Sequence, residues 1–172
     1  MHSEITIIDS SEKRPGFDRC VEVIHRDLHG QHRERCILGV KTATEVYAQI
    51  AAGEPIDLNN TYVKDFSAEG YRKHFSLPED HRIQILDFNA KGAYFDSLDK
   101  VDFSLVDFVG AETNFQEAVF GDCPISFYHA IFKTPNTFFN NAIFGAGLAN
   151  FQSVSYTHLR AHETSLHLVC RL

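Results

Sequence analysis

The sequence predicts an all-β solenoid, in which short strands wind into stacked coils. The prediction depends on a repeat of fixed length and on the alternation of residue types inside it. Phenylalanine recurs through residues 103–151 at gaps that alternate between five and seven residues, so the repeating unit has 12 residues and two aromatic positions. Self-similarity at a fixed period is typical of solenoid architectures. The repeated residues are Phe103, Phe108, Phe115, Phe120, Phe127, Phe132, Phe139, Phe144 and Phe151.

The residues that precede each phenylalanine favour strands over helices. Two positions before it the residue is small or β-branched, as at Val101 and Ala118, and one position before it is often polar, as at Asp102 and Asn114. Alternation between inward and outward positions is the pattern of a strand, whereas a helix needs apolar residues three and four apart. We therefore expect short strands separated by corners, coils stacked at about 4.8 Å, and rings aligned along the interior. An ordinary β-sandwich is the alternative, which turns at such regular spacing disfavour.

Residues 1–55 predict a small head and a helix that covers one end of the coils. Thr42 and Glu45 have the three-residue spacing of a capping box, and an apolar stripe follows them. Gly53 and Pro55 end this helix, which we expect at residues 43–52. A solenoid needs such a cover because a bare terminal coil exposes apolar surface and unpaired strand edges.

Residue types also predict the structure of the segments on either side of this helix. Residues 5–8 have the character of a strand, and residues 10–16 that of a turn. Residues 56–63 and 83–100 share the spacing of the repeat more faintly, with a slip before Phe103. The polar stretch 72–82 between them is expected to be a surface loop.

The repeat also resembles a known family. The segment Phe115-Gln-Glu-Ala118-Val-Phe120 is similar to the pentapeptide-repeat proteins, whose usual unit is Ala-(Asp/Asn)-Leu-x-x, in a variant centred on phenylalanine. The resemblance implies a right-handed quadrilateral β-helix with four sides per coil, which we expect over residues 56–153. This chain has two extra residues at alternate corners, so that one coil takes four more residues than the usual four-sided coil.

The C-terminal segment, residues 154–172, has a different character. Its sequence VSYTHLRAHET, residues 154–164, lacks the repeat and resembles the conceptual translation of a common transposase-type sequencing adapter. The constant downstream part of that adapter continues in the same frame to the final residues. We therefore expect residues 154–172 to be a non-native tail, the native sequence to stop at Ser153 within a repeat, and the intact protein to continue with further coils. A native amphipathic tail is the alternative.

Composition limits which classes of protein and which compartments fit this chain. Without the tail the chain has fourteen basic and twenty-two acidic residues and three widely spaced cysteines. No stretch approaches the ~20 apolar residues of a membrane span, and the first residues lack the basic and apolar regions of a secretory signal. An odd number of cysteines favours a reducing compartment, so we predict a cytoplasmic protein without a membrane span.

One cluster in the head suggests a metal site. Cys20, His25, His29, His32 and Cys36 lie close together in the chain. The spacings of four, three and four from His25 to Cys36 would place these residues on one face of a helix, where they could bind Zn²⁺. A glycine interrupts that helix, however, and no zinc-finger spacing fits. We therefore predict no metal ligand here.

Signatures of catalysis are missing from the sequence. It has no glycine-rich phosphate loop with a following lysine and no nucleophile elbow, and residues 145–147 are a repeat corner. Asp87, Asp102 and Asp107 stand at outward positions, where carboxylates usually form a solvated face. We predict no enzyme, no catalytic residue, no cofactor and no metal ligand, and the pattern does not single out a binding residue.

These observations favour a structural or protein-interaction scaffold, whose partner and oligomeric state the sequence leaves open. The alternative follows from charge. Residues 86–153 have eight acidic residues, all before residue 123, against three lysines. Some pentapeptide-repeat proteins resemble DNA in shape and charge and engage type II topoisomerases. An acidic face of this kind would bind a topoisomerase or another basic partner by electrostatic complementarity, and no direct binding of nucleic acid is expected.

Overall fold

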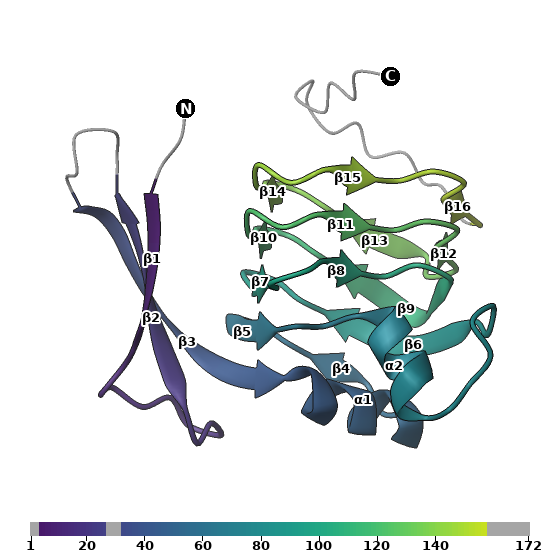
Figure 1. Cartoon of the computed structure of the whole chain (residues 1–172), viewed down its shortest axis with the longest axis horizontal. Coiled ribbons are helices and arrows are strands. Elements are labelled where there is room, and N and C mark those ends of the chain that lie inside the picture. Colours follow the sequence, from purple (N-terminus) through teal and green to yellow (C-terminus); the bar gives the residue numbers. More distant parts are fainter. Residues whose placement is uncertain (1–3, 27–31, 158–172) are drawn as a thin grey trace.

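The computed structural model describes residues 4–26 and 32–157 (Figure 1), and in these residues the chain is mostly β-strand with two helices. The predicted predominance of strands is thus confirmed. Neither helix has the length and apolar character that crossing a membrane requires. The elements are β1 (Glu4–Asp9), β2 (Cys20–Arg26), β3 (His32–Thr42), α1 (Ala43–Ala52), β4 (Ile56–Asp57), β5 (Thr61–Lys64), α2 (Ala68–His74), β6 (Ile83–Asn89), β7 (Tyr94–Asp96), β8 (Val101–Asp102), β9 (Val106–Asn114), β10 (Val119–Phe120), β11 (Ile125–Ser126), β12 (Ile131–Phe132), β13 (Asn136–Phe138), β14 (Ile143–Phe144), β15 (Ala149–Asn150) and β16 (Ser155–Tyr156).

The part of the chain from β4 to β16 forms the body of the molecule, in which short strands stack in parallel ladders (Figure 1). Strand β10 lies between β7 and β14, β11 lies between β8 and β15, and β12 lies between β9 and β16. Phe120 pairs with Phe144, and Phe108 pairs with Phe132. The members of each pair are two repeat units apart, so the chain returns to the same ladder after every second unit.

The phenylalanine rings lie inside the body in columns, which confirms their predicted inward position. Phe103, Phe115 and Phe127 have no exposed surface. Rings in one column stack almost parallel, as Phe103 does on Phe127 with centroids 5.0 Å apart and planes at 7°. Rings in neighbouring columns meet edge to face, as Phe115 and Phe127 do at 87°. Burial of each ring contributes about 2–3 kcal/mol, and each favourable ring pair adds about 0.5–1.5 kcal/mol.

The five-residue gap of the repeat has a conformational cause. The second residue after the first phenylalanine of each unit has φ between 54° and 58°, in the left-handed region. The turn closes when the backbone N–H of the next residue donates to the phenylalanine carbonyl, as Ala118 does to Phe115 at 3.1 Å. A positive φ at this position is the requirement of a type II turn. The five residues with this conformation are Leu105, Glu117, His129, Asn141 and Ser153.

The polar residues one position before these phenylalanines support the same turns. Asn114 Oδ1 accepts a hydrogen bond from the backbone N–H of Gln116 at 2.8 Å, and Asn150 Oδ1 accepts one from Gln152 at 2.9 Å. Side chains that bond the backbone two residues on stabilise turns. These polar residues therefore have a structural role in the corners, in addition to facing outward.

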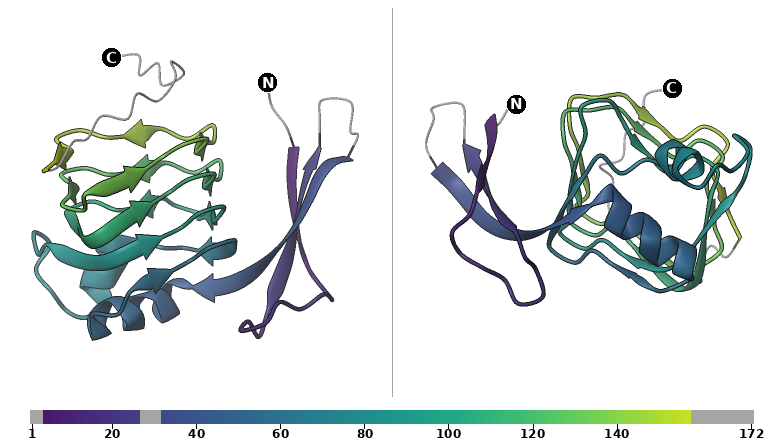
Figure 2. Two further views of the ribbon diagram at one scale, coloured as in Figure 1. Left: turned by 180° about the vertical axis from the view of Figure 1, so that it is seen from behind. Right: turned by 60° about the horizontal axis from the view of Figure 1, so that its bottom comes forward.

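Helix α1 covers one end of the body, as predicted (Figure 2, right). It begins at a reciprocal capping box, in which the Thr42 backbone N–H donates to the Glu45 carboxylate at 2.6 Å and Thr42 Oγ1 accepts from the Glu45 N–H at 3.4 Å. The bonds from Thr42 lower the pKa of Glu45. The helix ends at Gly53, with φ of 67°. It buries an apolar face, made by Val46, Tyr47 and Ile50, against the first strands of the body.

The second helix, α2, corrects the prediction of a loop over residues 72–82. Residues 72–74 form the last turn of α2, and only the remainder of that stretch is a loop. The helix begins after Ser67, whose hydroxyl accepts a hydrogen bond from the Gly70 N–H at 3.1 Å. Its side chains of Ala68 and Tyr71 are buried in the main core. Tertiary packing therefore stabilises a helix that is too short to be stable by its own propensity.

The head is an antiparallel sheet of β1, β2 and β3, and its first strand confirms the prediction for residues 5–8. Residues 20–26 and 32–42 are strands, so His25, His32 and Cys36 do not share one face of a helix. Strand β3 continues from the head into the body, where Gly39 pairs with both Cys20 of β2 and Thr61 of β5. The two parts of the molecule are therefore joined by one continuous strand (Figure 1).

The ladder continues into the segment that resembles adapter sequence. Ser155 and Tyr156 form β16, which pairs in parallel with β12. The Tyr156 ring stacks on Phe132 with centroids 5.0 Å apart and planes at 13°. Residues 158–172 lie outside the described residues.

Candidate functional site

A cleft of 630 Å³ lies between the head and the body. It exists because β3 pairs with β5 only from Gly39 onward, so that the earlier part of β3 leaves the body at an angle (Figure 1). Apolar side chains contribute to both walls. The head provides Val23, Cys36, Ile37 and Leu38, and the body provides Tyr94, Val119 and Ile143.

The body wall is an outward-facing apolar row on three stacked strands. Val119 of β10 pairs with Tyr94 of β7 on one side and with Ile143 of β14 on the other. Exposure rises along the row, from 6% at Tyr94 to 55% at Ile143. The adjacent ladder has polar residues at the equivalent outward positions, namely Asp102, Ser126 and Asn150. Of these two ladders, only the one that contains β7, β10 and β14 has an apolar row on its outer face.

Packing between the head and the body closes the base of the cleft. Val21, Val23 and Leu38 of the head form one buried cluster with Tyr62 and Tyr94 of the body. The Tyr62 and Tyr94 rings stack with centroids 5.9 Å apart, and the Tyr62 hydroxyl donates to Asp96 Oδ2 at 2.6 Å. Burial raises the pKa of Tyr94 to about 12, and burial followed by the bond to Asp96 raises the pKa of Tyr62. Both phenols therefore stay neutral at physiological pH.

A polar edge follows the corner of the body beside this cleft. Its residues Asn60, Gly92, Glu117 and Asn141 all have positive φ and stand above one another at successive corners. The Arg14 guanidinium of the head donates to the Asn60 carbonyl at the base. Glu117 is exposed, and the Gln116 amide donates to its carboxylate at 3.3 Å. The site thus combines apolar walls with a carboxylate at its edge.

The head also brings a strand edge to the cleft. Residues 32–38 of β3 pair with β2 on one side. On the other side β5 begins only opposite Gly39, and no strand of the described residues pairs with residues 32–38 there. At such an edge the backbone N–H and C=O groups of alternate residues, here Arg35 and Ile37, face away from β2 and can hydrogen-bond to another strand.

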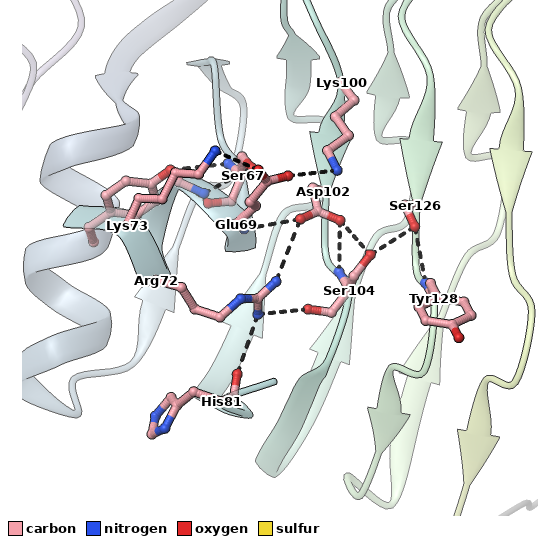
Figure 3. A network of polar contacts seen from close by, with 12 residues as sticks. Ser67, Glu69, Arg72, Lys73, His81, Lys100, Asp102, Ser104, Ser126 and Tyr128 are labelled. Carbon is pink, nitrogen blue, oxygen red and sulfur yellow. Dashed lines mark hydrogen bonds and ion pairs between the residues drawn. The ribbon is translucent and has the colours of Figure 1, made fainter. Parts of the chain in front are cut away.

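A second hollow, of 530 Å³, lies beside α2 and is polar (Figure 3). Its central carboxylate, Asp102, is 1% exposed and accepts hydrogen bonds from the backbone N–H groups of Glu69 at 3.0 Å and Ser104 at 3.1 Å. The Arg72 guanidinium lies 3.9 Å from Asp102 and donates to the Ser104 carbonyl at 3.2 Å. These bonds join α2 to the body.

The polar side chains of this hollow are joined by hydrogen bonds and an ion pair (Figure 3). The Ser104 hydroxyl bonds to Asp102 and Ser126, and His81 contributes its backbone carbonyl while its ring points away (Figure 3). Hydrogen bonds from Lys73 and then Lys100 lower the pKa of Glu69 to about 2, so the nearby lysine charges are already neutralised.

Two of the aspartates that were expected on a solvated face are buried, so that prediction is wrong for them. Asp102 caps α2, and Asp107 is 5% exposed between Arg82 and Lys133. Burial opposes ionisation of Asp107, but the hydrogen bonds from Arg82 and Lys133 outweigh it and lower its pKa. Asp87 is half-buried and accepts from the Ala111 N–H at 2.6 Å.

The cysteine and histidine cluster of the head is only partly described. Cys20 is buried and accepts a hydrogen bond from the Arg14 N–H at 3.3 Å, and Cys36 lines the cleft. His29 and the side chains of His25 and His32 lie outside what the structure describes. The side chains that are described contain no group of three metal-ligating residues.

Sequence reasoning missed the cleft, although a signal was present. The position before each phenylalanine is polar at several corners, but it is Tyr94, Val119 and Ile143 before Phe95, Phe120 and Phe144. An apolar residue at an outward position, repeated once in every coil, indicates a row that another surface covers.

The regularly spaced buried phenylalanines show that this chain is a repeat protein. Comparison with protein-family models, with curated proteins and with solved structures found no match.

Proposed function

We propose that this protein is a non-enzymatic protein-interaction scaffold that holds a partner in the cleft between its head and its body. The apolar row that ends in Ile143 carries the proposal. This side chain is 55% exposed and faces a second apolar wall across the cleft. Apolar surface that a partner removes from water contributes about 25 cal/mol per Å² to association before the costs of ordering are subtracted.

We further propose that the body is a right-handed quadrilateral β-helix of the pentapeptide-repeat type, over residues 56–153, with residues 1–55 as its head and cap. Pairing between residues two repeat units apart, stacked ring columns and left-handed corners all support this architecture. A regular stack of this kind gives a rigid wall, which suits a scaffold better than a catalyst that must move.

The adapter resemblance leads us to propose that residues 154–172 are not native. The pairing of Ser155 and Tyr156 does not oppose this, because an exposed strand edge accepts a short aromatic segment of unrelated origin. Reading the genomic DNA past the codon of Ser153 tests the proposal. A different continuation would support it, and the same nineteen codons in genomic DNA would overturn it.

Selection from a displayed library of protein fragments against the purified full chain tests the scaffold function. Fragments that bind the wild type should be lost with Ile143→Glu, which places a charge in the cleft. They should be kept with Leu148→Glu, which changes a 77% exposed leucine outside the cleft lining in the same turn of the repeat. Fragments that bind both variants equally, or no selected fragment at all, would contradict a binding function for this cleft.

A further inference from the structure

We propose that the occupant of the cleft is an extended segment of a partner protein, which adds as a β-strand to the free edge of β3 and places a basic residue against Glu117. The inference rests on the proposed function and specifies the chemistry of the partner at the same site. Three features of the cleft support it, namely the edge of β3 that faces away from β2, the two apolar walls and the exposed carboxylate of Glu117.

The backbone of β3 offers the first argument. The Val40 N–H donates to the Arg19 carbonyl at 2.9 Å, which is on the β2 side. In an antiparallel pair the hydrogen-bonding groups of successive residues alternate between the two edges. The backbone groups of Ile37 and Arg35 therefore point to the opposite edge, which is the edge that β5 uses from Gly39 onward.

Continuity with the existing sheet supports a strand over another shape. Strand β5 already pairs with this edge in parallel, with Gly39 opposite Thr61 and Thr42 opposite Lys64. The cleft lies beside the part of β3 that precedes Gly39, where the pairing with β5 starts. A segment that lies along residues 34–38 would extend an interface that the molecule already forms, and its main-chain bonds would provide affinity without requiring one particular sequence.

The side chains of the cleft specify what alternate residues of the segment must be. Cys36 and Leu38 pair with Val23 and Val21 of β2, and these residues belong to the apolar face of the head that packs toward the body. Every second side chain of an added strand would project on that same face. There it would contact the exposed row on the opposite wall. The segment should therefore have apolar residues at i and i+2.

The charge of Glu117 predicts one more feature of the bound segment, a basic residue. Glu117 is an exposed carboxylate of the body wall, and its contact is the neutral amide of Gln116. The chain has a net charge of −7, which favours approach of a cationic segment. A lysine or arginine beside the apolar pair would form an ion pair with Glu117, and such an exposed pair contributes specificity more than affinity.

Random nonapeptides displayed against the full chain test this chemistry. Enriched sequences should alternate apolar and polar residues and contain a lysine or arginine, and Ile143→Glu should abolish their binding while Leu148→Glu should not. The best peptide is then synthesised with single N-methyl groups. Methylation at the amides that face β3 should weaken binding about tenfold, and methylation at the intervening amides should change it less than about twofold.

Hydrogen exchange tests the pairing of the peptide with β3, and substitution of Glu117 tests the ion pair. Bound peptide should slow exchange of the Ile37 and Arg35 amides. Glu117→Gln should weaken a lysine peptide about threefold at low salt and less at high salt, whereas Glu54→Gln, at an exposed residue next to the helix cap, should not. Enriched peptides with helical spacing, or peptides insensitive to N-methylation but lost with Ile143→Glu, would overturn strand addition and leave the binding function standing. Peptides indifferent to Ile143→Glu would overturn both.

Discussion

The body and the head of this protein are both β-structures, but they depend on their residues in different ways. In the body, strands such as β10, β11 and β12 have a parallel partner on each side, and the Phe120 ring of β10 stacks on the rings of Phe95 and Phe144 in the neighbouring strands. The head is connected through β3, and a small cluster around Tyr62 and Tyr94 holds it in place. The contrast suggests that repetition makes the body rigid, whereas a few contacts set the position of the head and hence the width of the cleft.

The strongest test of the body is a charge in its interior. Phe127→Asp should destabilise the chain by about 4 kcal/mol or more, because it removes a fully buried ring and leaves an unpaired carboxylate among the neighbouring rings. Urea denaturation followed by far-UV circular dichroism measures this. Tyr128→Asp changes the adjacent, exposed residue and should have little effect. A Phe127→Asp protein as stable as the control would contradict the interior position of the columns.

The strongest test of the head is its junction. A β-carbon on Gly39 would lie 2.2 Å from the Phe17 ring, so Gly39→Ala should displace that ring and destabilise the head by about 1–3 kcal/mol. Hydrogen exchange should then be faster in β1 and β2 and unchanged in β10 and β11. Adding Phe17→Ala should restore part of the loss, because it removes the atoms in conflict. Equal acceleration in body and head would show that the two parts unfold as one unit.

Asp107 tests whether buried charge pairs stabilise the body. Its pKa is lowered in the folded state, so its contribution is present above the unfolded value near 4 and is lost as the pH falls through the lower, folded value. Asp107→Asn should cost about 1–2 kcal/mol at pH 7, a range reduced because Arg82 and Lys133 are partly exposed, and should flatten the acid limb of the stability curve. Denaturation at pH 3 and pH 7 measures both effects. Asp99→Asn, at an exposed carboxylate, is the control.

The parts of the fold that the sequence predicted depend on local or periodic signals. The inward position of the phenylalanines follows from their fixed period, and the bounds of α1 follow from Thr42, Glu45 and Gly53. The unpredicted parts depend on residues far apart in the chain. Asp102 caps α2 from 33 residues away, and Arg82 reaches Asp107 across 25 residues. The cleft belongs to the second group, because it requires the divergence of β3 from the body.

The smallest expected effect concerns a single corner of the body. Asn141 has φ of 57°, a conformation that asparagine and glycine tolerate better than alanine. Asn141→Ala should therefore cost about 0.5–1 kcal/mol, Asn141→Gly should change stability by only a few tenths, and Asn140→Ala, at an exposed neighbour without positive φ, should be close to neutral. Thermal unfolding of the four proteins measures the differences. Because the body repeats this corner in every unit, a cost confined to Asn141→Ala would show that the left-handed residue sets the five-residue step. Equal values for all three variants would place the cause of the step in the packing of the rings instead.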